Sequence, residues 1–212
     1  MQPAHPAKIE FVNHAALLVE YQGTRLLSDP WLSGSAFNDG WDLLCETRMP
    51  IERFAEISYI WYSHEHPDHF APGLLKQIPA DLRSGITILY QKTRDRKVLK
   101  FCAQLGYLTR ELPPGLPVEL QPGFTATCGP VPFFDSWLLV DAGGTRILNL
   151  NDCVLERPAD LEPVRRQAGA VDVLCTQFSY AAWKGNRGDQ ALRKEAAAAN
   201  LRIIRSQLQI LQ

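Results

Sequence analysis

The feature that most constrains this chain is a histidine-rich loop at residues 63–69. It directly follows residues 57–62, an apolar, aromatic and β-branched run that predicts a buried strand. The loop reads Ser63-His64-Glu65-His66-Pro67-Asp68-His69. Imidazole and carboxylate groups are the ligands that zinc, iron and manganese share. The loop therefore predicts a metal site at the end of a core strand; a polar surface loop that is histidine-rich by chance is the weaker alternative.

The spacing within the loop divides its side chains between two metal ions. His64 and His66 are alternate residues, so both can turn toward one ion, whereas Asp68 and His69 reach a second ion just beyond it. Glu65 lies between two of these ligands and is expected to point away from them, so we do not expect it to act as a general base.

The pattern His64-x-His66-x-Asp68-His69 resembles the H-x-H-x-D-H signature of the metallo-β-lactamase superfamily. The resemblance implies an α/β fold, the αββα sandwich, as a single domain over residues 1–212. It also implies that the first two histidines bind one metal and the Asp-His pair binds the second. Asp152, at the end of another strand, resembles the aspartate that bridges the two ions.

Other segments are similar to one branch of that superfamily, and the likeness extends over about residues 8–205. The branch includes lactonase-like proteins, the N-acyl-phosphatidylethanolamine phospholipase D type and relatives of CMP-N-acetylneuraminate hydroxylase, which are nearest in character. The segments are Asp29-Pro30-Trp31-Leu32, Gly40-Trp41, Asn151-Asp152-Cys153 and Gln177-Phe178-Ser179.

The chain departs from the family pattern at the next ligand. The family supplies another histidine shortly before its bridging aspartate, but this chain has no histidine after His69, and Asp135 stands at the matching place. Asp135 is either a substitute ligand or a residue at the start of a strand without metal contact. A carboxylate in place of imidazole would shift the preference of the site toward iron or manganese.

A second departure lies at the C-terminus, where the family places its final histidine. The sequence ends at Leu211-Gln212, within an apparent helix that would lead into a further core strand. We therefore expect a truncated fold or a lost ligand, and with it a site that holds only one metal well and is impaired in catalysis.

Two further residues are candidates for supporting the metal ligands. Asp29 resembles the family's aspartate that accepts a hydrogen bond from a ligand histidine and so fixes its tautomer; an ordinary turn aspartate is the alternative. His14 either lines the mouth of the site or is a structural histidine. Residues 184–188 form a basic loop that could hold an anion or could simply be solvated. Aromatic side chains that could wall a substrate pocket are Trp31, Trp41, Phe70, Phe133, Phe134, Trp137 and Trp183.

The remaining chain alternates short strands and helices. Strands are expected near residues 8–12, 16–21, 25–28, 86–90, 124–127, 137–140, 147–150 and 171–176, with helices near 50–54, 72–77, 93–105, 161–167 and from 190 onward. Residues 113–117 are expected to be an irregular connector. The last helix is expected to present one apolar face through Leu192, Ala196, Ala199, Ile203 and Leu211.

Composition limits the setting in which such a site would work. A net charge of −1 and a pI near 6.5 give no reason to expect nucleic acid as a partner. The five cysteines are widely spaced and odd in number, which indicates thiols in a reducing cytoplasm rather than a disulfide framework. The N-terminus lacks the pattern of a signal peptide, and no apolar run is long enough for a membrane span.

The sequence supports three hypotheses about function. The first is a hydrolase that uses a metal-bound hydroxide on a small ester, lactone or phosphodiester, with one or two divalent ions, zinc being favoured and iron or manganese possible. Asp68 would also orient the nucleophilic water. The second is an iron-dependent oxygenase or hydroxylase on the same fold. The third is a degenerate, non-catalytic binding or scaffold domain. The substrate and the oligomeric state are left open.

Overall fold

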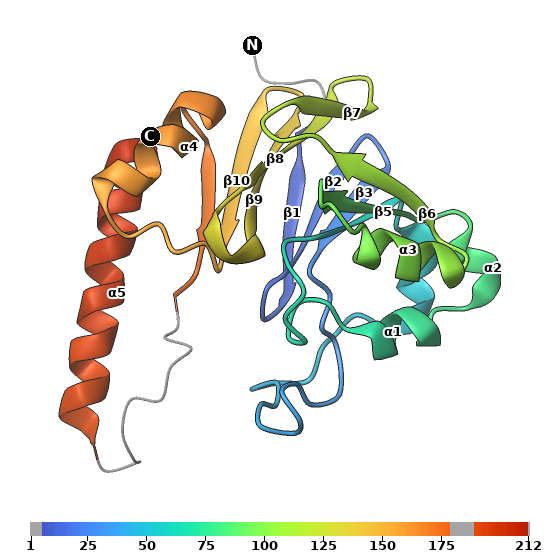
Figure 1. Cartoon of the computed structure of the whole chain (residues 1–212), viewed down its shortest axis with the longest axis horizontal. Coiled ribbons are helices and arrows are strands. Elements are labelled where there is room, and N and C mark those ends of the chain that lie inside the picture. Colours follow the sequence, from blue (N-terminus) through green and yellow to red (C-terminus); the bar gives the residue numbers. More distant parts are fainter. Residues whose placement is uncertain (1–5, 179–188, 212) are drawn as a thin grey trace.

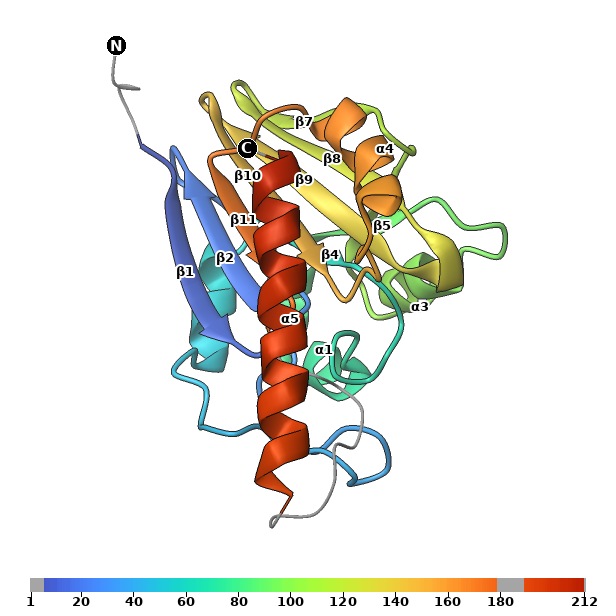
Figure 2. The ribbon, with the colours of Figure 1, turned by 90° about the vertical axis from the view of Figure 1, so that its left-hand side faces the viewer.

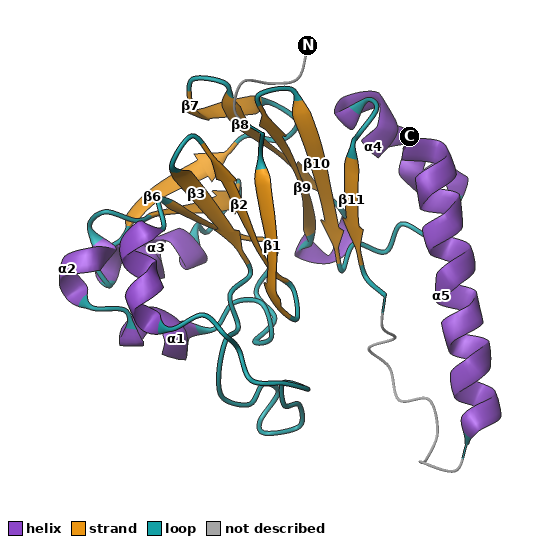
Figure 3. Cartoon of the chain, turned by 180° about the vertical axis from the view of Figure 1, so that it is seen from behind, coloured by secondary structure: helices purple, strands orange, loops and turns teal. Residues whose placement is uncertain are grey.

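The computed structural model describes residues 6–178 and 189–211. Two β-sheets pack face to face, and helices cover the outer face of each sheet (Figure 1). Seen from behind, the helices again lie outside and the sheets inside (Figure 3). This arrangement is the αββα sandwich that the sequence predicts.

The first sheet contains six strands in the order β1-β2-β3-β4-β5-β6. β1 to β3 form an antiparallel meander, and β3 to β6 run parallel. The strands are β1 (Lys8–Asn13), β2 (Ala16–Tyr21), β3 (Thr24–Ser28), β4 (Tyr59–Tyr62), β5 (Thr87–Gln91) and β6 (Leu108–Leu112). The helices along this half are η1 (Ile51–Glu56), α1 (Pro72–Gln77), α2 (Ala80–Arg83) and α3 (Lys97–Gln104).

The second sheet contains five strands in the order β11-β10-β9-β8-β7, with β10 and β11 parallel and the other pairs antiparallel. Its strands are β7 (Pro117–Gln121), β8 (Phe124–Pro130), β9 (Ser136–Ala142), β10 (Thr145–Asn151) and β11 (Val173–Thr176). The helices on its side are η2 (Pro132–Phe134), α4 (Pro158–Ala168) and α5 (Gln190–Leu211).

β4 shows why the sheets stack in this way. Its residues are apolar on both faces, so neither face can be left in water. Trp61 is buried in the cluster between the two sheets, whereas Ile60 and Tyr62 are buried in the cluster against the helices. The apolar run that precedes the histidine loop is therefore enclosed on both sides, and it fixes the start of the loop in the core.

Two strands on either side of the connector at residues 113–117 were not expected from the sequence. β6 alternates exposed and partly buried residues and has only a weak apolar pattern, whereas β7 alternates exposed residues with the buried Val118 and Leu120 over a short span. Pairing to β5 and β8 supplies the backbone hydrogen bonds that favour strand conformation there. The helix expected over residues 93–105 begins later, at Lys97.

The expected apolar face of α5 is only partly correct. Leu192 is 53% exposed, and the residues of α5 that are fully buried are Gln207 and Leu211. The side chain of Gln207 accepts a hydrogen bond from Thr176 Oγ1 at 2.8 Å and donates one to the Leu155 carbonyl at 3.1 Å. Figure 2 shows α5 running along the second sheet and extending beyond its strands. A helix of 22 residues is about 33 Å long, which exceeds any strand beneath it, so its first half cannot be covered by that sheet.

Among the described residues, no helix is long and apolar enough to cross a membrane. All five cysteines are free thiols, four of them buried or partly buried and Cys45 exposed.

Candidate metal centre

The histidine loop lies where the carboxyl ends of several strands meet. In the first sheet, Asp29 follows β3 and Ser63 follows the parallel strand β4. In the second sheet, Asn151 ends β10 and is followed by Asp152. Because the two sheets face each other, these three strand ends bring residues more than 80 positions apart into hydrogen-bond contact, as Asn151 and Ser63 show at 2.9 Å.

The first pair of histidines converges on one point. His64 Nε2 lies 2.8 Å from His66 Nδ1, with the ring centroids 4.4 Å apart. The other nitrogen of His64, Nδ1, lies 2.9 Å from the Ser63 hydroxyl, which fixes the orientation of the ring. His64 is buried and His66 is exposed, so the point where the two rings meet lies at the boundary between the core and solvent.

A second group of ligand atoms surrounds His69. Its Nε2 atom lies 3.4 Å from Asp68 Oδ2 and 3.2 Å from Asp152 Oδ2. The donor atoms of His64, His69 and Asp152 all lie within 4.8 Å of one another, as do those of His14, Asp68 and His69. The structure thus brings together all the loop residues expected to bind metal, and it adds Asp152 from the second sheet.

These spacings fit a divalent ion. Two donor atoms on one tetrahedral ion, each about 2.1 Å from it, lie about 3.4 Å apart. The contacts around His69 are 3.2–3.4 Å, and those atoms are not arranged as hydrogen bonds: both nitrogens of His69 and Asp68 Oδ1 are buried without a hydrogen-bond partner among the described residues. Buried polar atoms rarely lack partners in proteins, and a cation bound at His69 Nε2 would supply the partner that this nitrogen lacks.

The electrostatics of the site also favour a cation. Burial alone would lower the pKa of His69, but the carboxylates of Asp152, Asp29 and Asp68 raise it well above its usual range. Burial and the neighbouring His69 lower the pKa of His64 to about 4, so its imidazole is neutral at pH 7 and can donate a lone pair. Burial opposes ionisation of Asp152, yet contact with His69 holds the pKa of this carboxyl below its usual value.

Asp29 supports the site from beneath. It is fully buried, and its Oδ1 atom accepts a hydrogen bond from the Ser63 amide at 2.8 Å. Its Oδ2 atom accepts a hydrogen bond from the Asn151 side chain and lies 3.4 Å from His69 Nδ1. Asp29 therefore joins three strand ends behind the ligands, which agrees with the supporting role expected from the sequence.

Other residues of this supporting network were missed in the sequence. Asn151 donates to both Asp29 and the Ser63 hydroxyl, and Ser136 Oγ donates to the Ser63 carbonyl at 2.7 Å. Gln91, at the end of β5, donates to the Phe134 carbonyl at 2.5 Å and to the Ser63 carbonyl at 3.3 Å. A polar residue at the end of an apolar strand is the sequence feature that could have identified Gln91 and Asn151.

The structure places Asp135 next to His64, with its Oδ1 atom 3.4 Å from His64 Nδ1. This nitrogen is not the one that converges with His66, and Asp135 belongs to neither group of clustered donor atoms. Burial raises the pKa of Asp135 to about 7. The residue is thus at the site but oriented behind the first histidine, so both alternatives given for it in the sequence still stand.

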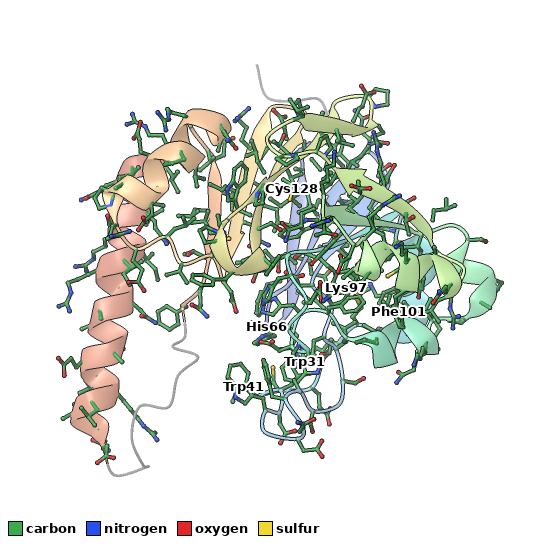
Figure 4. The ribbon with its side chains drawn as sticks, viewed as in Figure 1. Trp31, Trp41, His66, Lys97, Phe101 and Cys128 are labelled. Carbon is green, nitrogen blue, oxygen red and sulfur yellow. The ribbon has the colours of Figure 1, made fainter. Side chains whose placement is uncertain are left out.

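The aromatic residues near the histidines differ in part from the expected set. Trp31 packs edge-on against His14 with ring centroids 5.2 Å apart. Phe37, which was not in that set, lies 6.0 Å from the His66 ring and 4.9 Å from Trp41. Figure 4 shows His66 beside the loops that carry Trp31 and Trp41. These side chains provide an apolar wall on the solvent side of the site.

Other members of that set lie elsewhere. Trp137 is buried on the α4 side of the second sheet, where it lines a cavity of about 680 Å³ that no candidate ligand lines. Phe133 and Phe134 are exposed. Trp183 and the basic loop at residues 184–188 lie outside the described residues. Glu65 points away from the ligands, as expected, and forms an ion pair of 2.6 Å with Lys97.

Comparison with known proteins identifies the family. Residues 8–178 match the family model of the beta-lactamase superfamily domain. The chain belongs to the metallo-β-lactamase superfamily. Members of this fold family bind divalent metals, and the clustered histidine and aspartate side chains described above are the candidate ligands in this chain.

Within the metallo-β-lactamase superfamily, the chain is similar to the hydroxylase-like branch expected from the sequence. It is 29% identical over 153 residues to cytidine monophosphate-N-acetylneuraminic acid hydroxylase from Xenopus laevis, an alignment that covers 69% of this chain and 26% of the relative. The chain spans about a third or less of the length of the curated relatives that it matches.

Solved structures with the same metallo-β-lactamase fold include proteins of two chemical classes. A possible metal-dependent hydrolase from Veillonella parvula gives a TM-score of 0.62 at 17% identity and covers 92% of this chain and 83% of that one. CmlA, a diiron beta-hydroxylase from Streptomyces venezuelae, gives a TM-score of 0.56 at 17% identity and covers 79% of this chain and 34% of that one. At these identities the likeness shows the fold alone.

Proposed function

We propose that this chain forms a two-metal site that hydrolyses a small ester, lactone or phosphodiester. The observation that supports the proposal most directly is the set of contacts around His69. Its Nε2 atom lies 3.4 Å from Asp68 Oδ2 and 3.2 Å from Asp152 Oδ2, close to the separation of two donor atoms on one metal ion. We assign His64, His66 and Asp152 to the first ion, with Asp135 as a candidate further ligand. We assign Asp68, His69 and Asp152 to the second.

The ions would supply a hydroxide at neutral pH, by lowering the pKa of bound water toward about 7, and would polarise the scissile group. Asp68 is suited to orient the nucleophilic water. Its Oδ2 atom faces His14 and His69, whereas its buried Oδ1 atom has no hydrogen-bond partner among the described residues and could accept one from that water. Phe37 and Trp41 would hold the apolar part of a small substrate at the mouth.

Zinc is the favoured ion because three of the assigned ligands are imidazoles, a ligand type that suits zinc. The five cysteines are free thiols on separate elements, and on this basis we propose that the protein functions in a reducing cytoplasm. The near-neutral charge gives no reason to propose nucleic acid as the substrate.

Metal content provides the direct test. The purified chain, reconstituted with zinc and then dialysed, is expected to hold between one and two equivalents by elemental analysis. Less than about 0.1 equivalent of any transition metal would contradict the proposal, because a formed ligand cluster binds metal tightly. His66→Ala is expected to lose at least one equivalent. Glu65→Gln is the matched control, because Glu65 lies between two ligands but pairs with Lys97, and it should leave the content unchanged.

Activity then separates hydrolysis from a scaffold role. The zinc-loaded chain is expected to cleave at least one of a p-nitrophenyl ester, an acyl lactone and bis-p-nitrophenyl phosphate, and His66→Ala is expected to reduce that rate by at least about 100-fold. A non-catalytic domain would show no turnover with any of these substrates. In that case His66→Ala would change only its stability, and only modestly.

A second candidate, iron-dependent hydroxylation, is favoured by two observations. A carboxylate, Asp135, stands where the family has a histidine, and carboxylates shift a site toward iron. The Xenopus laevis relative is named a hydroxylase. This candidate predicts that the iron-loaded chain is coloured and turns over only with oxygen and a reductant. A colourless, zinc-loaded chain with hydrolytic turnover would rule it out.

A further inference from the structure

His14 lies beside the second group of ligands. Its Nε2 atom is 3.0 Å from Asp68 Oδ2, and its ring centroid is 5.6 Å from that of His69. The donor atoms of all three residues lie within 4.8 Å of one another. We propose that His14 is a direct ligand of the second metal and completes the set formed by Asp68, His69 and Asp152. This inference rests on the two-metal site of the proposed function.

The backbone around His14 is arranged to present its side chain to the site. His14 lies in the turn between β1 and β2 with φ of 49°, and the strand pairing shifts register between Phe11 and Asn13. A left-handed conformation is unfavourable for a residue other than glycine, and such conformations cluster at functional sites. Asp29 and Asn151, which contact each other behind the candidate ligands, also have left-handed backbone conformations, with φ of 39° and 50°.

Neighbouring side chains fix this turn in place. The Asn13 amide donates to the Cys45 carbonyl at 3.1 Å and to Thr47 Oγ1 at 2.7 Å. Trp31 is buried and packs edge-on against the His14 ring at an interplanar angle of 85°. The imidazole is thus held in one orientation before any metal binds, which reduces the entropy lost on binding.

One of the side chains beside His14 carries a buried nitrogen without a hydrogen bond. Asp68 contacts His14 through Oδ2, and His69 Nε2 is buried without a hydrogen bond among the described residues. The His14 side chain is 30% exposed, so it lies between this group of atoms and the solvent but leaves part of the site accessible. An ion held between them would satisfy the buried atoms and would leave an open position for water.

The histidine content of the chain points to the same residue. Three of the five histidines are in the loop, and none follows His69. Of the two histidines outside the loop, His5 lies outside the described residues. His14 is the histidine that the fold brings to the second metal.

A variant series separates a ligand from a residue that only hydrogen-bonds to Asp68. His14→Gln keeps a donor that can reach Asp68 but has no imidazole lone pair, whereas His14→Ala loses both. If His14 is a ligand, both variants should keep one zinc equivalent and bind the second at least about 100-fold more weakly, in titrations against a chromophoric chelator. The visible bands of the cobalt-loaded protein should also weaken in both.

Gln22→Ala is the matched control. Gln22 is exposed, lies in another turn of the same sheet and has φ of 48°, so it reports the cost of alanine in a left-handed turn without touching the site. Thermal unfolding of the three variants would show whether the fold is kept. If His14→Ala does not fold, His14→Gly takes its place in the series, because glycine tolerates this φ.

The outcomes distinguish this inference from the proposed function. Wild-type protein that binds no metal would overturn the proposed function and the inference with it. Wild-type protein with two equivalents, together with His14→Gln that also keeps two at unchanged affinity, would overturn only the role of His14 and would make it a positioning residue. An anomalous-scattering structure of the zinc-loaded chain should place His14 Nε2 at about 2.1 Å from the second ion.

Discussion

Asp29→Ala is expected to cause the largest combined loss of stability and metal binding of any single substitution behind the site. Asp29 is fully buried, and it receives hydrogen bonds from the Ser63 amide and the Asn151 side chain while facing His69. Alanine would leave these groups buried without an acceptor. Each such group costs about 1–3 kcal/mol, so the free energy of unfolding should fall by about 3–5 kcal/mol.

The effect on metal binding follows from the position of His69. Without the carboxylate, nothing orients its Nδ1 side, and groups that orient a ligand histidine typically contribute 10- to 100-fold to affinity. Asp29→Asn provides the test if Asp29→Ala does not fold. One amide oxygen can still accept from Ser63, but an NH₂ group would face another donor on Asn151, so zinc affinity should fall by at least about 10-fold.

Asp39→Asn is the matched control for Asp29→Asn. Asp39 is an exposed carboxylate that also has a positive φ, 63°, so the same change of charge and backbone preference is made away from the site. Urea unfolding and zinc titration of both variants provide the measurements. Equal values for the two would mean that the hydrogen bonds of Asp29 contribute nothing to the site.

Gly129→Ala is expected to destabilise the second sheet severely. Gly129 in β8 pairs with Trp137 in β9, and a Cβ atom built on Gly129 would overlap the Trp137 indole. Trp137 is 2% exposed and packs into the core beneath α4, so the indole must move from that core or the strands must separate. Overpacking of this kind costs about 3 kcal/mol, equivalent to a decrease in melting temperature of about 6–12 °C.

Gly73→Ala provides the control for this substitution. Gly73 lies in α1, and a Cβ atom there meets nothing within 4 Å, so alanine should leave stability unchanged or raise it by up to about 1 kcal/mol. Scanning calorimetry of the two variants should therefore show shifts of different size. A shift below about 2 °C for Gly129→Ala would show that the indole relocates without cost, into the adjoining cavity that it lines.

Much of the architecture could be predicted from local patterns. Residues 57–62 are apolar on both faces and become a strand with both faces covered, and the strands expected near residues 137–140 and 147–150 form the antiparallel pair β9 and β10. β6 has only a weak alternation of apolar residues, so local patterns did not predict it, whereas β7 was missed although Val118 and Leu120 alternate with exposed residues. Leu192 was wrongly placed in the packed face of α5, because periodicity shows which residues share a face of a helix but not how much of that face meets a partner.

The sequence by itself determined the candidate metal-binding loop, since His64, His66, Asp68 and His69 are neighbours along the chain and need only a strand before them. It also indicated Asp152 and Asp29, through their positions at strand ends. Only the tertiary structure decided how these residues meet. The strand ends of two facing sheets bring Asn151 onto Ser63, and a left-handed turn brings His14 to Asp68 across 54 positions. Such contacts depend on sheet packing and backbone conformation, which no local pattern of residues specifies.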